Sequence, residues 1–371
     1  MALEEGEPYK AMKPKVSICV PNLNTRPFLP ERFETIFSQS FQDWELLVYD
    51  SYSEDGAWEY IQELAAREER MRAWQGPRQG TPGSWNPCIH EAKGEYVYIA
   101  TSDDTMALDC LEKLVAALEQ HKHCGLAHCR LVYIDETGRR LPNPWWPDKT
   151  VFERSAGELI NQPHIRRAPY DGLLPLTGMN NYFSFTQLLI RRSLFEQIGP
   201  LESRWGSMGD CNWYMRAGLV SNTVHVPDTW ATLRVHPKSA TRRLIFFTPE
   251  YYARVEDMIL DAVRACEKHI DPPVLAGLNS HWMNWARELR AYDRECLRLR
   301  RNVLRRRLYQ VAQLFTSSAV RRQIVGKLFG KPGWQEAAPA EIRRWLESLG
   351  LGPMIVPAQP RAADRVESLS N

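Results

Sequence analysis

Short apolar strands alternate with helical stretches between Val16 and Tyr133, and this alternation is what most constrains the fold. The segments that read as strands are Val16–Val20, Trp44–Tyr49, Met71–Gln75 and Gly94–Ala100. Helical periodicity runs between them, over roughly 28–38, 57–70 and 84–92. Strands that alternate with helices are typical of βαβ units. The sequence therefore predicts an α/β fold with a mostly parallel central sheet flanked by helices.

The rest of the chain is less regular until a helical end. Residues from about 135 to 181 are rich in Pro and Trp, and order returns with the segment 185–190, a helix over 192–198, another helix that starts near Gly209 and a strand over 230–236. Beyond Pro249 the pattern is helical, which predicts a C-terminal α-helical extension. We expect four parts: an N-terminal leader (1–14), the α/β domain (15–245), the helical extension (246–352) and a disordered tail (353–371).

Composition is that of an ordinary globular protein, with 371 residues, 44% apolar and 25% charged. The chain does not open with the basic-then-apolar pattern of a secretory signal, and no apolar run approaches the roughly 20 residues of a membrane span. The eight cysteines include no Cys-x-x-Cys pair. We therefore expect reduced thiols in a cytoplasmic protein.

The fourth predicted strand runs directly into Thr101-Ser102-Asp103-Asp104-Thr105. Two adjacent carboxylates at the end of a buried strand are costly unless a positive charge lies beside them. A divalent cation carrying a diphosphate would supply that charge, because hard cations bridge carboxylates to phosphates. In open α/β sheets, ligands also collect at the carboxyl ends of strands. The alternative is that the pair only caps a helix that begins near Leu108.

Other polar clusters lie at comparable positions. Pro21-Asn22-Leu23-Asn24 follows the first strand, Asp50 ends the second, and Asp210 begins a helix after a Gly-rich turn. Loops at the same edge of a parallel sheet converge, so we expect these clusters to share one cleft with Asp103 and Asp104. Taken alone, Asp210 could equally be a helix cap.

Several segments, taken in order, resemble the family 2 glycosyltransferases, whose fold is called GT-A. The resemblance covers roughly residues 15 to 240, and the segments that carry it are Val16 to Asn24, Phe37 to Asp50, Ser53-Glu54-Asp55-Gly56, Ala92 to Asp104, Leu189 to Gly199, and Gly209-Asp210 through Arg216. No single segment is specific, but their order is. There are departures: Thr101, Ser51 and Gly209 stand where the family often has a carboxylate.

The resemblance implies an inverting transfer of a sugar from a nucleoside diphosphate sugar, with a UDP-sugar favoured, to a hydroxyl of a glycan, lipid-linked or other acceptor. Residues 15–134 would hold the nucleotide sugar, and 135–245 would shape the acceptor site. The general base would be Asp210. A divalent ion, Mn²⁺ or Mg²⁺, would be held by Asp104, with His236 of the Arg234-Val235-His236-Pro237 segment as a further ligand.

The resemblance also assigns the nucleotide pocket. Its expected residues are Pro21, Asn22, Asn24, Asp50, which would accept from the base ring, and Asp103, which would touch the ribose or the metal's waters. Two alternatives remain: a nucleotidyltransferase, which would want a glycine-rich phosphate loop that Pro21 to Arg26 lacks, and a catalytically silent nucleotide- or sugar-binding scaffold.

A basic segment stands out in the extension. Residues 281–330 hold twelve Lys/Arg against three Asp/Glu, and an apolar stripe at helical spacing runs over 297–315 with arginines beside it. The segment could be a solvated face, a nucleic-acid site or an interfacial helix. We expect no nucleic acid, because no recognition motif accompanies the charge. The stripe favours a peripheral contact with the inner membrane face, or packing on the catalytic domain.

Overall fold

The computed structural model describes residues 13–80, 82–142, 157–178, 180–237, 248–328 and 334–358. Its strands are β1 (Val16–Asn22), β2 (Trp44–Asp50), β3 (Met71–Gln75), β4 (Tyr96–Ile99), β5 (Cys124–Ile134), β6 (Arg140–Leu141), β7 (His164–Arg166), β8 (Leu188–Arg191), β9 (Asn222–Arg234) and β10 (Ile355–Pro357). Its helices are α1 (Leu29–Phe37), α2 (Ala57–Ala65), α3 (Asn86–Glu91), α4 (Cys110–Gln120), α6 (Tyr170–Leu173), α7 (Arg192–Ile198), α8 (Gly209–Val220), α9 (Pro249–Cys266), α10 (Pro272–Gly277), α11 (Met283–Arg298), α12 (Val303–Thr316), α13 (Ser318–Leu328) and α14 (Trp334–Ser348).

The strands form one mixed sheet in the order β10-β7-β9-β5-β8-β4-β1-β2-β3, with β6 on β5. The four strands β3, β2, β1 and β4 are parallel, as predicted. The other half departs from the mostly parallel expectation, because β8 is antiparallel to both of its neighbours, β4 and β5. The chain passes from β4 through α4 to β5 and leaves a gap that β8 fills later. The α/β class and the helical C-terminal region are both confirmed.

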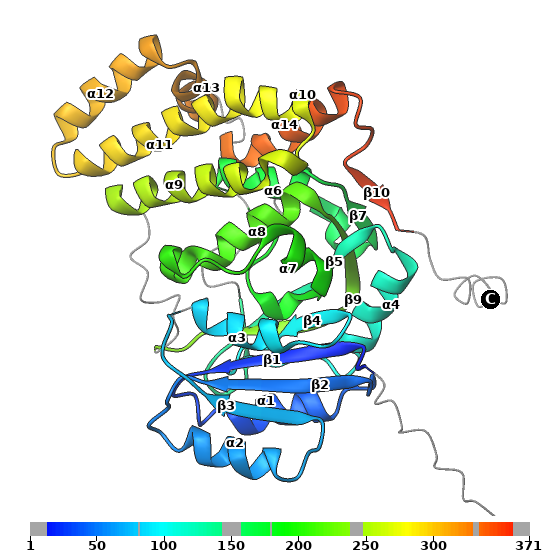
Figure 1. Ribbon diagram of the computed structural model, residues 1–371. Helices are drawn as coiled ribbons and strands as arrows, with labels where there is room; N and C mark the ends of the chain where they lie inside the picture. Colours follow the sequence, from blue (N-terminus) through cyan, green and yellow to red (C-terminus); the bar gives the residue numbers. More distant parts are fainter. Residues whose placement is uncertain are drawn as a thin grey trace, which may run out of the picture.

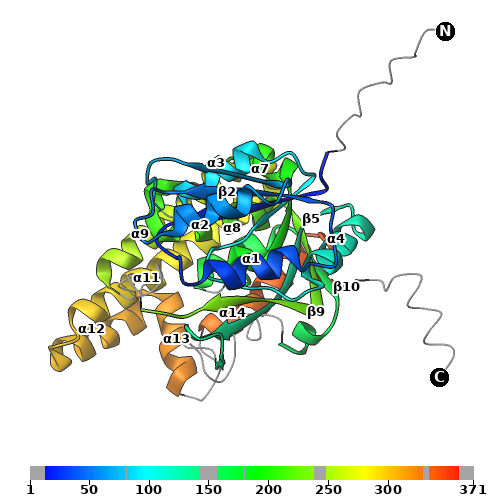
Figure 2. The same cartoon turned by 90° about the horizontal axis from the view of Figure 1, so that it is seen from below.

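Helices cover both faces of this sheet (Figures 1 and 2). Residues of α1, α2 and α4 form one hydrophobic core with one face, and residues of α3, α7 and α8 form a second core with the other. Because both faces are covered, every residue of β1 and β2 is buried, and this explains their continuous apolar runs. β3 and α7 have the predicted bounds, whereas β9 begins at Asn222, eight residues before the predicted strand.

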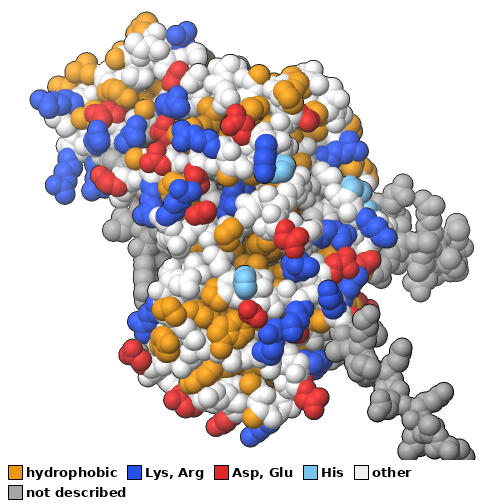
Figure 3. Space-filling model, viewed as in Figure 1, with side chains coloured by type: hydrophobic (Ala, Val, Ile, Leu, Met, Phe, Trp, Pro, Cys, Tyr) orange, Lys and Arg blue, Asp and Glu red, His pale blue; other side chains and the backbone are white. Residues whose placement is uncertain are grey.

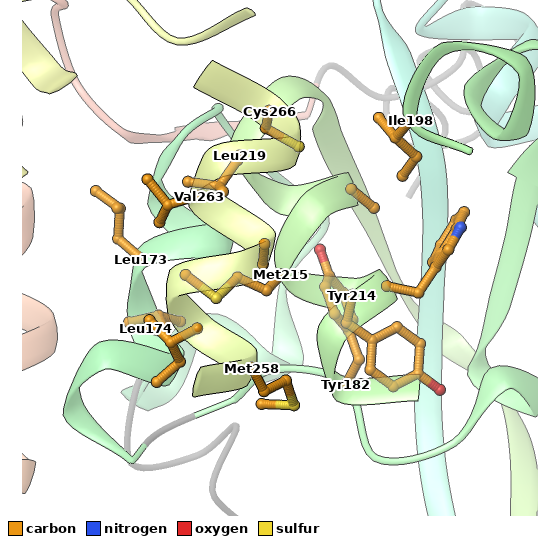
Figure 4. Close-up of a cluster of buried hydrophobic side chains, with 14 of the residues drawn as sticks. Leu173, Leu174, Tyr182, Ile198, Tyr214, Met215, Leu219, Met258, Val263 and Cys266 are labelled. Atoms are coloured by element: carbon orange, nitrogen blue, oxygen red, sulfur yellow. The ribbon is translucent and has the colours of Figure 1, made fainter. Parts of the chain in front are cut away.

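Helix α8 lies at the centre of the second core, between the sheet and α9 (Figure 4). Met215 and Leu219 pack beside Met258 and Val263 of α9. On its other side α8 approaches α6 so closely that a Cβ on Gly218 would lie 2.5 Å from the backbone nitrogen of Gly172. Only glycine allows this contact, which sets how closely the end of α8 packs against α6.

The helical extension packs outward from α8 through α9 to α11, and α14 returns to the α6 region (Figure 1). Among the helices that the structure describes, none is long and apolar enough to cross a membrane. Residues 353–358, expected to begin the disordered tail, are ordered instead. Met354 is buried and β10 pairs antiparallel with β7, because a short edge strand satisfies its backbone on that neighbour. Residues 1–12 and 359–371 lie outside the described ranges.

A buried polar cluster joins β5, β7 and β9. His128, His164 and His225 are at most 1% exposed, and their neighbour Arg166 forms an ion pair with the buried Asp171, with Nε 2.8 Å from Oδ2. Burial, followed by the charge of Arg166, lowers the pKa of all three histidines, in His164 to about 4. The fold therefore holds these imidazoles in their neutral form.

This cluster predicts acid sensitivity. Below pH ~6.5 the three histidines bind protons in the unfolded chain but stay neutral in the folded protein. The free energy of unfolding therefore falls as pH drops. Each histidine contributes a slope of about 1.4 kcal/mol per pH unit. Chemical denaturation between pH 7 and 4.5 should show a smaller slope in His164→Gln and an unchanged slope in the exposed control His90→Gln. Equal slopes in all three proteins would contradict this account.

Candidate functional site

The carboxyl ends of β1, β2 and β4 lie along one edge of the sheet, on the left in Figure 1. Asn22 and Asp50, the last residues of β1 and β2, are register partners, and Asn22 Nδ2 donates to Asp50 Oδ2 at 2.6 Å. The Asp50 carboxylate also accepts from Ser53 Oγ, Ser53 N and Gln75 Nε2 at 2.6, 2.9 and 2.8 Å. Asp50 is fully buried and organises the turn, and its predicted contact with a base ring stays a prediction.

Asn24 completes this turn. Its φ of 53° is left-handed, a conformation that Asn tolerates better than most residues. Its N–H donates to Ser53 Oγ at 2.8 Å, and its Oδ1 accepts from the Glu54 N–H at 2.8 Å. Pro21, the residue before Asn22 in β1, is buried. The structure thus brings Pro21, Asn22, Asn24 and Asp50 together, as the sequence predicts.

Asp104 points into the protein. Its side chain is 1% exposed, Oδ1 accepts the backbone N–H of Arg234 at 2.6 Å, and Oδ2 accepts the hydroxyl of Thr101. Burial, then the nearby Asp103 carboxylate, raises the pKa of Asp104 to about 8. Each carboxylate oxygen of Asp104 already accepts a hydrogen bond from a protein donor. This argues against the predicted role of Asp104 as the metal ligand.

Asp103 contacts His236 and stays partly exposed. Its Oδ2 lies 3.0 Å from Nε2 of His236, and its side chain keeps 23% exposure against 7% for the histidine. The ring of His236 also packs on Phe28, with centroids 4.9 Å apart. Neither aspartate caps the following helix, because the residue before α4 is Asp109.

Arg234 holds this pair in place. Its Nε donates to the carbonyl of Asp103 at 2.6 Å, its Nη1 to the carbonyl of Asp135 at 3.1 Å, and its Nη2 to Glu31 at 2.5 Å. The guanidinium is 1% exposed and lies 5.0 Å from the Phe28 ring centroid. A single side chain thus ties the end of β9 to the loop after β4 and to α1.

Arg32 is a residue that sequence reasoning missed. It belongs to α1, is fully buried, and its three guanidinium nitrogens have no hydrogen-bond partner within the described structure. Its charge favours the ionised form of Asp104 and lowers that group's pKa. A basic residue on the buried face of an otherwise amphipathic helix was the only signal that the sequence offered.

Asp210 is the second residue of α8, where the macrodipole favours a negative charge. Its Oδ1 accepts the backbone N–H of Cys211 at 2.6 Å. The side chain is partly exposed, yet its surroundings are apolar enough that burial raises its pKa to about 6. A carboxylate with that pKa can take a proton from a hydroxyl near neutral pH.

The loop over 82–85 connects the two groups of residues. Ser84 Oγ lies 3.3 Å from Ser51 Oγ beside the Asp50 turn. On the other side, a Cβ on Gly209 would lie 2.7 Å from Pro82 Cδ and 2.6 Å from the carbonyl oxygen of Glu202. This packing excludes a side chain at 209 and brings the start of α8 against the same loop.

Residues 17–199 match the family model described as glycosyl transferase family 2. This domain belongs to glycosyltransferase family 2. The matched segment contains the strand ends and Asp103 but stops before Asp210 and His236. The predicted family is therefore confirmed, and the roles of the individual residues remain proposals.

Known relatives share part of this family 2 domain. A putative glycosyltransferase from Bacillus subtilis, EpsE, is 34% identical over 34% of this chain and 46% of its own length. A Campylobacter jejuni β-1,3-glucosyltransferase, named for the substrate GalNAc(5)-diNAcBac-PP-undecaprenol, is 31% identical over 31% of this chain and 37% of its own. The chain therefore spans less than half of the length of either relative.

Solved structures of low overall similarity also match. The mannosyltransferase PcManGT from Pyrobaculum calidifontis, solved with GDP-Man and Mn²⁺, has a TM-score of 0.49 and 16% identity, and the match covers 92% of this chain and 91% of that protein. TarS from S. aureus, solved with UDP, has a TM-score of 0.46 and 19% identity, over 67% of this chain and 65% of that protein.

Asp103 and His236 are the side chains here that could hold a divalent cation. No group of three His, Cys, Asp or Glu side chains able to hold a metal occurs in the part of the chain that the structure describes. Asp103 and His236 alone supply one oxygen and one nitrogen. Mg²⁺ is commonly held by one or two carboxylates and completed by phosphate and water, and Mn²⁺ likewise suits carboxylate and water ligands.

The contacts of Arg234 predict a cost for its replacement. Arg234→Lys keeps the charge but cannot make the forked contacts to Asp103, Asp135 and Glu31, and we expect it to lower the free energy of unfolding by about 2–4 kcal/mol. Thermal and urea unfolding measure this change. Arg139→Lys is the control, because the Arg139 side chain is 81% exposed, and it should leave the free energy of unfolding unchanged. An unchanged stability in Arg234→Lys would show that the link is not structural.

Proposed function

We propose that this protein is an inverting glycosyltransferase that moves a sugar from a nucleoside diphosphate sugar, UDP-sugar favoured, to an acceptor hydroxyl. One observation carries the proposal: Asp210, with a pKa raised to about 6, begins α8 beside the loop that reaches the Asp50 turn. Family 2 membership supports sugar transfer as the reaction. The undecaprenol-linked substrate named for the C. jejuni relative favours a glycan or lipid-linked acceptor.

The metal is assigned to Asp103 and His236 in place of Asp104. Asp103 keeps an exposed carboxylate beside the imidazole, whereas both oxygens of Asp104 accept from protein donors. Mn²⁺ or Mg²⁺ there would neutralise the developing charge of the leaving diphosphate. Asn22, Asn24 and the buried Asp50 would line the nucleoside pocket, with Pro21 beneath them.

The chain's own groups support a direct displacement. As the acceptor oxygen bonds to the anomeric carbon, its proton passes to a carboxylate oxygen of Asp210 and the bond from that carbon to the diphosphate oxygen breaks. Attack from the face opposite the leaving group inverts the anomeric configuration. We propose a cytoplasmic location for this reaction, supported by eight cysteines that are all free thiols.

The base assignment predicts a loss of transfer without a loss of donor binding. Asp210→Asn keeps the size of the side chain but cannot take the proton, so kcat should fall by roughly 10²- to 10⁴-fold. Donor affinity, measured by calorimetry, should stay the same. Glu202→Gln changes a partly exposed carboxylate of the preceding turn and serves as the matched control. Turnover near that of the wild type in Asp210→Asn would remove Asp210 as the base.

The same pKa predicts the acid side of the pH profile. Asp210 must be ionised to act, and its pKa of about 6 means that it becomes protonated as pH falls through that value. We expect kcat to fall about tenfold from its plateau by pH 5. Turnover in single-pH assays, checked for reversibility at pH 7.5, measures the profile. A plateau that extends below pH 4.5 would contradict the raised pKa.

The metal assignment predicts different effects for substitutions at the two adjacent aspartates, Asp103 and Asp104. In Asp103→Asn we expect the Mn²⁺-dependent part of UDP affinity to fall at least tenfold, because a carboxylate ligand is lost. In Asp104→Asn we expect near-normal nucleotide binding but a lower melting temperature, because a buried acceptor is lost. Calorimetry with UDP or GDP, with and without Mn²⁺, measures both. The opposite pattern would return the metal to Asp104.

The two alternatives give different products. A nucleotidyltransferase would release pyrophosphate from a nucleoside triphosphate and a sugar phosphate, whereas a glycosyltransferase releases a nucleoside diphosphate from its donor. A silent scaffold would do neither, although it could bind the donor. Slow hydrolysis of a UDP-sugar by the purified protein, absent in Asp103→Asn, would favour the transferase over both.

A further inference from the structure

Helix α12 presents an apolar stripe to solvent. Leu304, Leu308, Val311 and Phe315 are exposed by 70, 62, 53 and 78%, and no residue of the helix is buried. At about 100° per residue these four side chains fall within roughly 60° of the helix surface. An exposed stripe of this kind marks an interaction site more often than an isolated exposed leucine does.

The opposite side of α12 faces the protein. Tyr309 stacks on Tyr292 of α11 with ring centroids 6.0 Å apart, and Gln310 Nε2 donates to the Tyr292 hydroxyl at 3.1 Å. These contacts fix the rotation of the helix about its axis. The apolar stripe therefore points away from the fold because of packing and not because the helix lacks a defined orientation.

Arginines border the stripe. Arg305 and Arg307 lie on its two sides, and Arg298, Arg300 and Arg301 occupy the end of α11 and the turn before α12. In the described structure, Arg300, Arg301, Arg305 and Arg307 form no ion pair with a carboxylate. Figure 3 shows Lys and Arg side chains gathered with hydrophobic ones at this end of the molecule.

The segment is also free of negative charge. Residues 296–335 contain eight Arg and two Lys and no Asp or Glu. We propose that α12 and the turn before it bind the surface of an anionic lipid bilayer, with the stripe from Leu304 to Phe315 inserted at the headgroup boundary. An amphipathic helix of this kind binds through buried apolar area together with attraction between its basic residues and acidic lipids.

The same features disfavour other occupants. A second copy of this chain docked through the stripe would bring two sets of arginines together, and like charges in contact oppose association. A nucleic acid would use the arginines but leave the four apolar side chains in water. An anionic bilayer would attract the arginines and would also take the four apolar side chains out of water.

Helix α12 and the carboxyl ends of β1 and β2 both lie toward the left in Figure 1, with α12 near the top and the strand ends lower down. Binding itself does not depend on the proposed transfer, and it is measured without donor or acceptor.

The test is flotation of the full chain with vesicles. We expect binding to phosphatidylcholine vesicles that contain 30% phosphatidylglycerol and little binding to phosphatidylcholine alone. At roughly 1 kcal/mol for each Arg near the surface, the double variant Arg305→Gln/Arg307→Gln should lose about 30-fold in partition coefficient. Leu308→Ser/Phe315→Ser should also lose binding, and 0.5 M salt should weaken the wild type.

Matched controls come from the opposite end of the chain. Arg67→Gln/Lys122→Gln removes two exposed charges, and Leu108→Ser removes a side chain that is 63% exposed. Both should bind as the wild type does, and all variants should keep its melting temperature. Absence of wild-type binding to the anionic vesicles, or binding unchanged in both α12 variants, overturns the proposal. If the wild type does not bind vesicles but dimerises with increasing concentration, and Leu308→Ser/Phe315→Ser abolishes that dimerisation, the stripe is a dimer interface and the proposal is also overturned.

Discussion

The buried link between Asp104 and the end of β9 is the interaction on which the site depends. The Asp104 carboxylate accepts the backbone N–H of Arg234, and just beyond it Thr105 N–H donates to Thr232 Oγ1 at 2.7 Å. In the sheet, β8 and β5 lie between β4 and β9, so no strand pairing brings these ends together. The loop after β4 makes the connection instead, and it thereby places Asp103 beside His236.

This link puts a carboxylate inside the protein, which is costly unless a positive charge is near. Arg32 lies fully buried and without a hydrogen-bond partner in the described structure, and its charge favours ionised Asp104. Arg32 therefore offsets part of the cost of ionising Asp104, but burial and the nearby Asp103 still raise the pKa of Asp104 to about 8. Asp103, which keeps 23% exposure, contacts the largely buried His236 just outside this inner pair.

The sequence predicts the parallel half of the sheet well, because β1, β2 and β4 are largely apolar and buried and helical segments separate the strands. It does not predict that β8 fills the place between β4 and β5, since strand order depends on contacts far apart in the chain. It brings the candidate residues to the right edge but cannot separate Asp103 from Asp104. Neighbouring side chains can point in opposite directions, and contacts with residues far along the chain, such as Arg234 and His236, distinguish the two.

The departure at Gly209 has a physical reason that also bears on the proposed base, Asp210. A side chain at 209 would collide with Pro82 and with the carbonyl of Glu202, so the carboxylate that the family often has there cannot be accommodated. The pKa of Asp210 is consequently raised by burial alone and not by a second carboxylate. A base of this kind depends on its apolar surroundings, and hence on the loop that packs against the start of α8. Ser84 of the same loop lies beside Ser51, so this one loop contacts both the Asp50 turn and the start of α8.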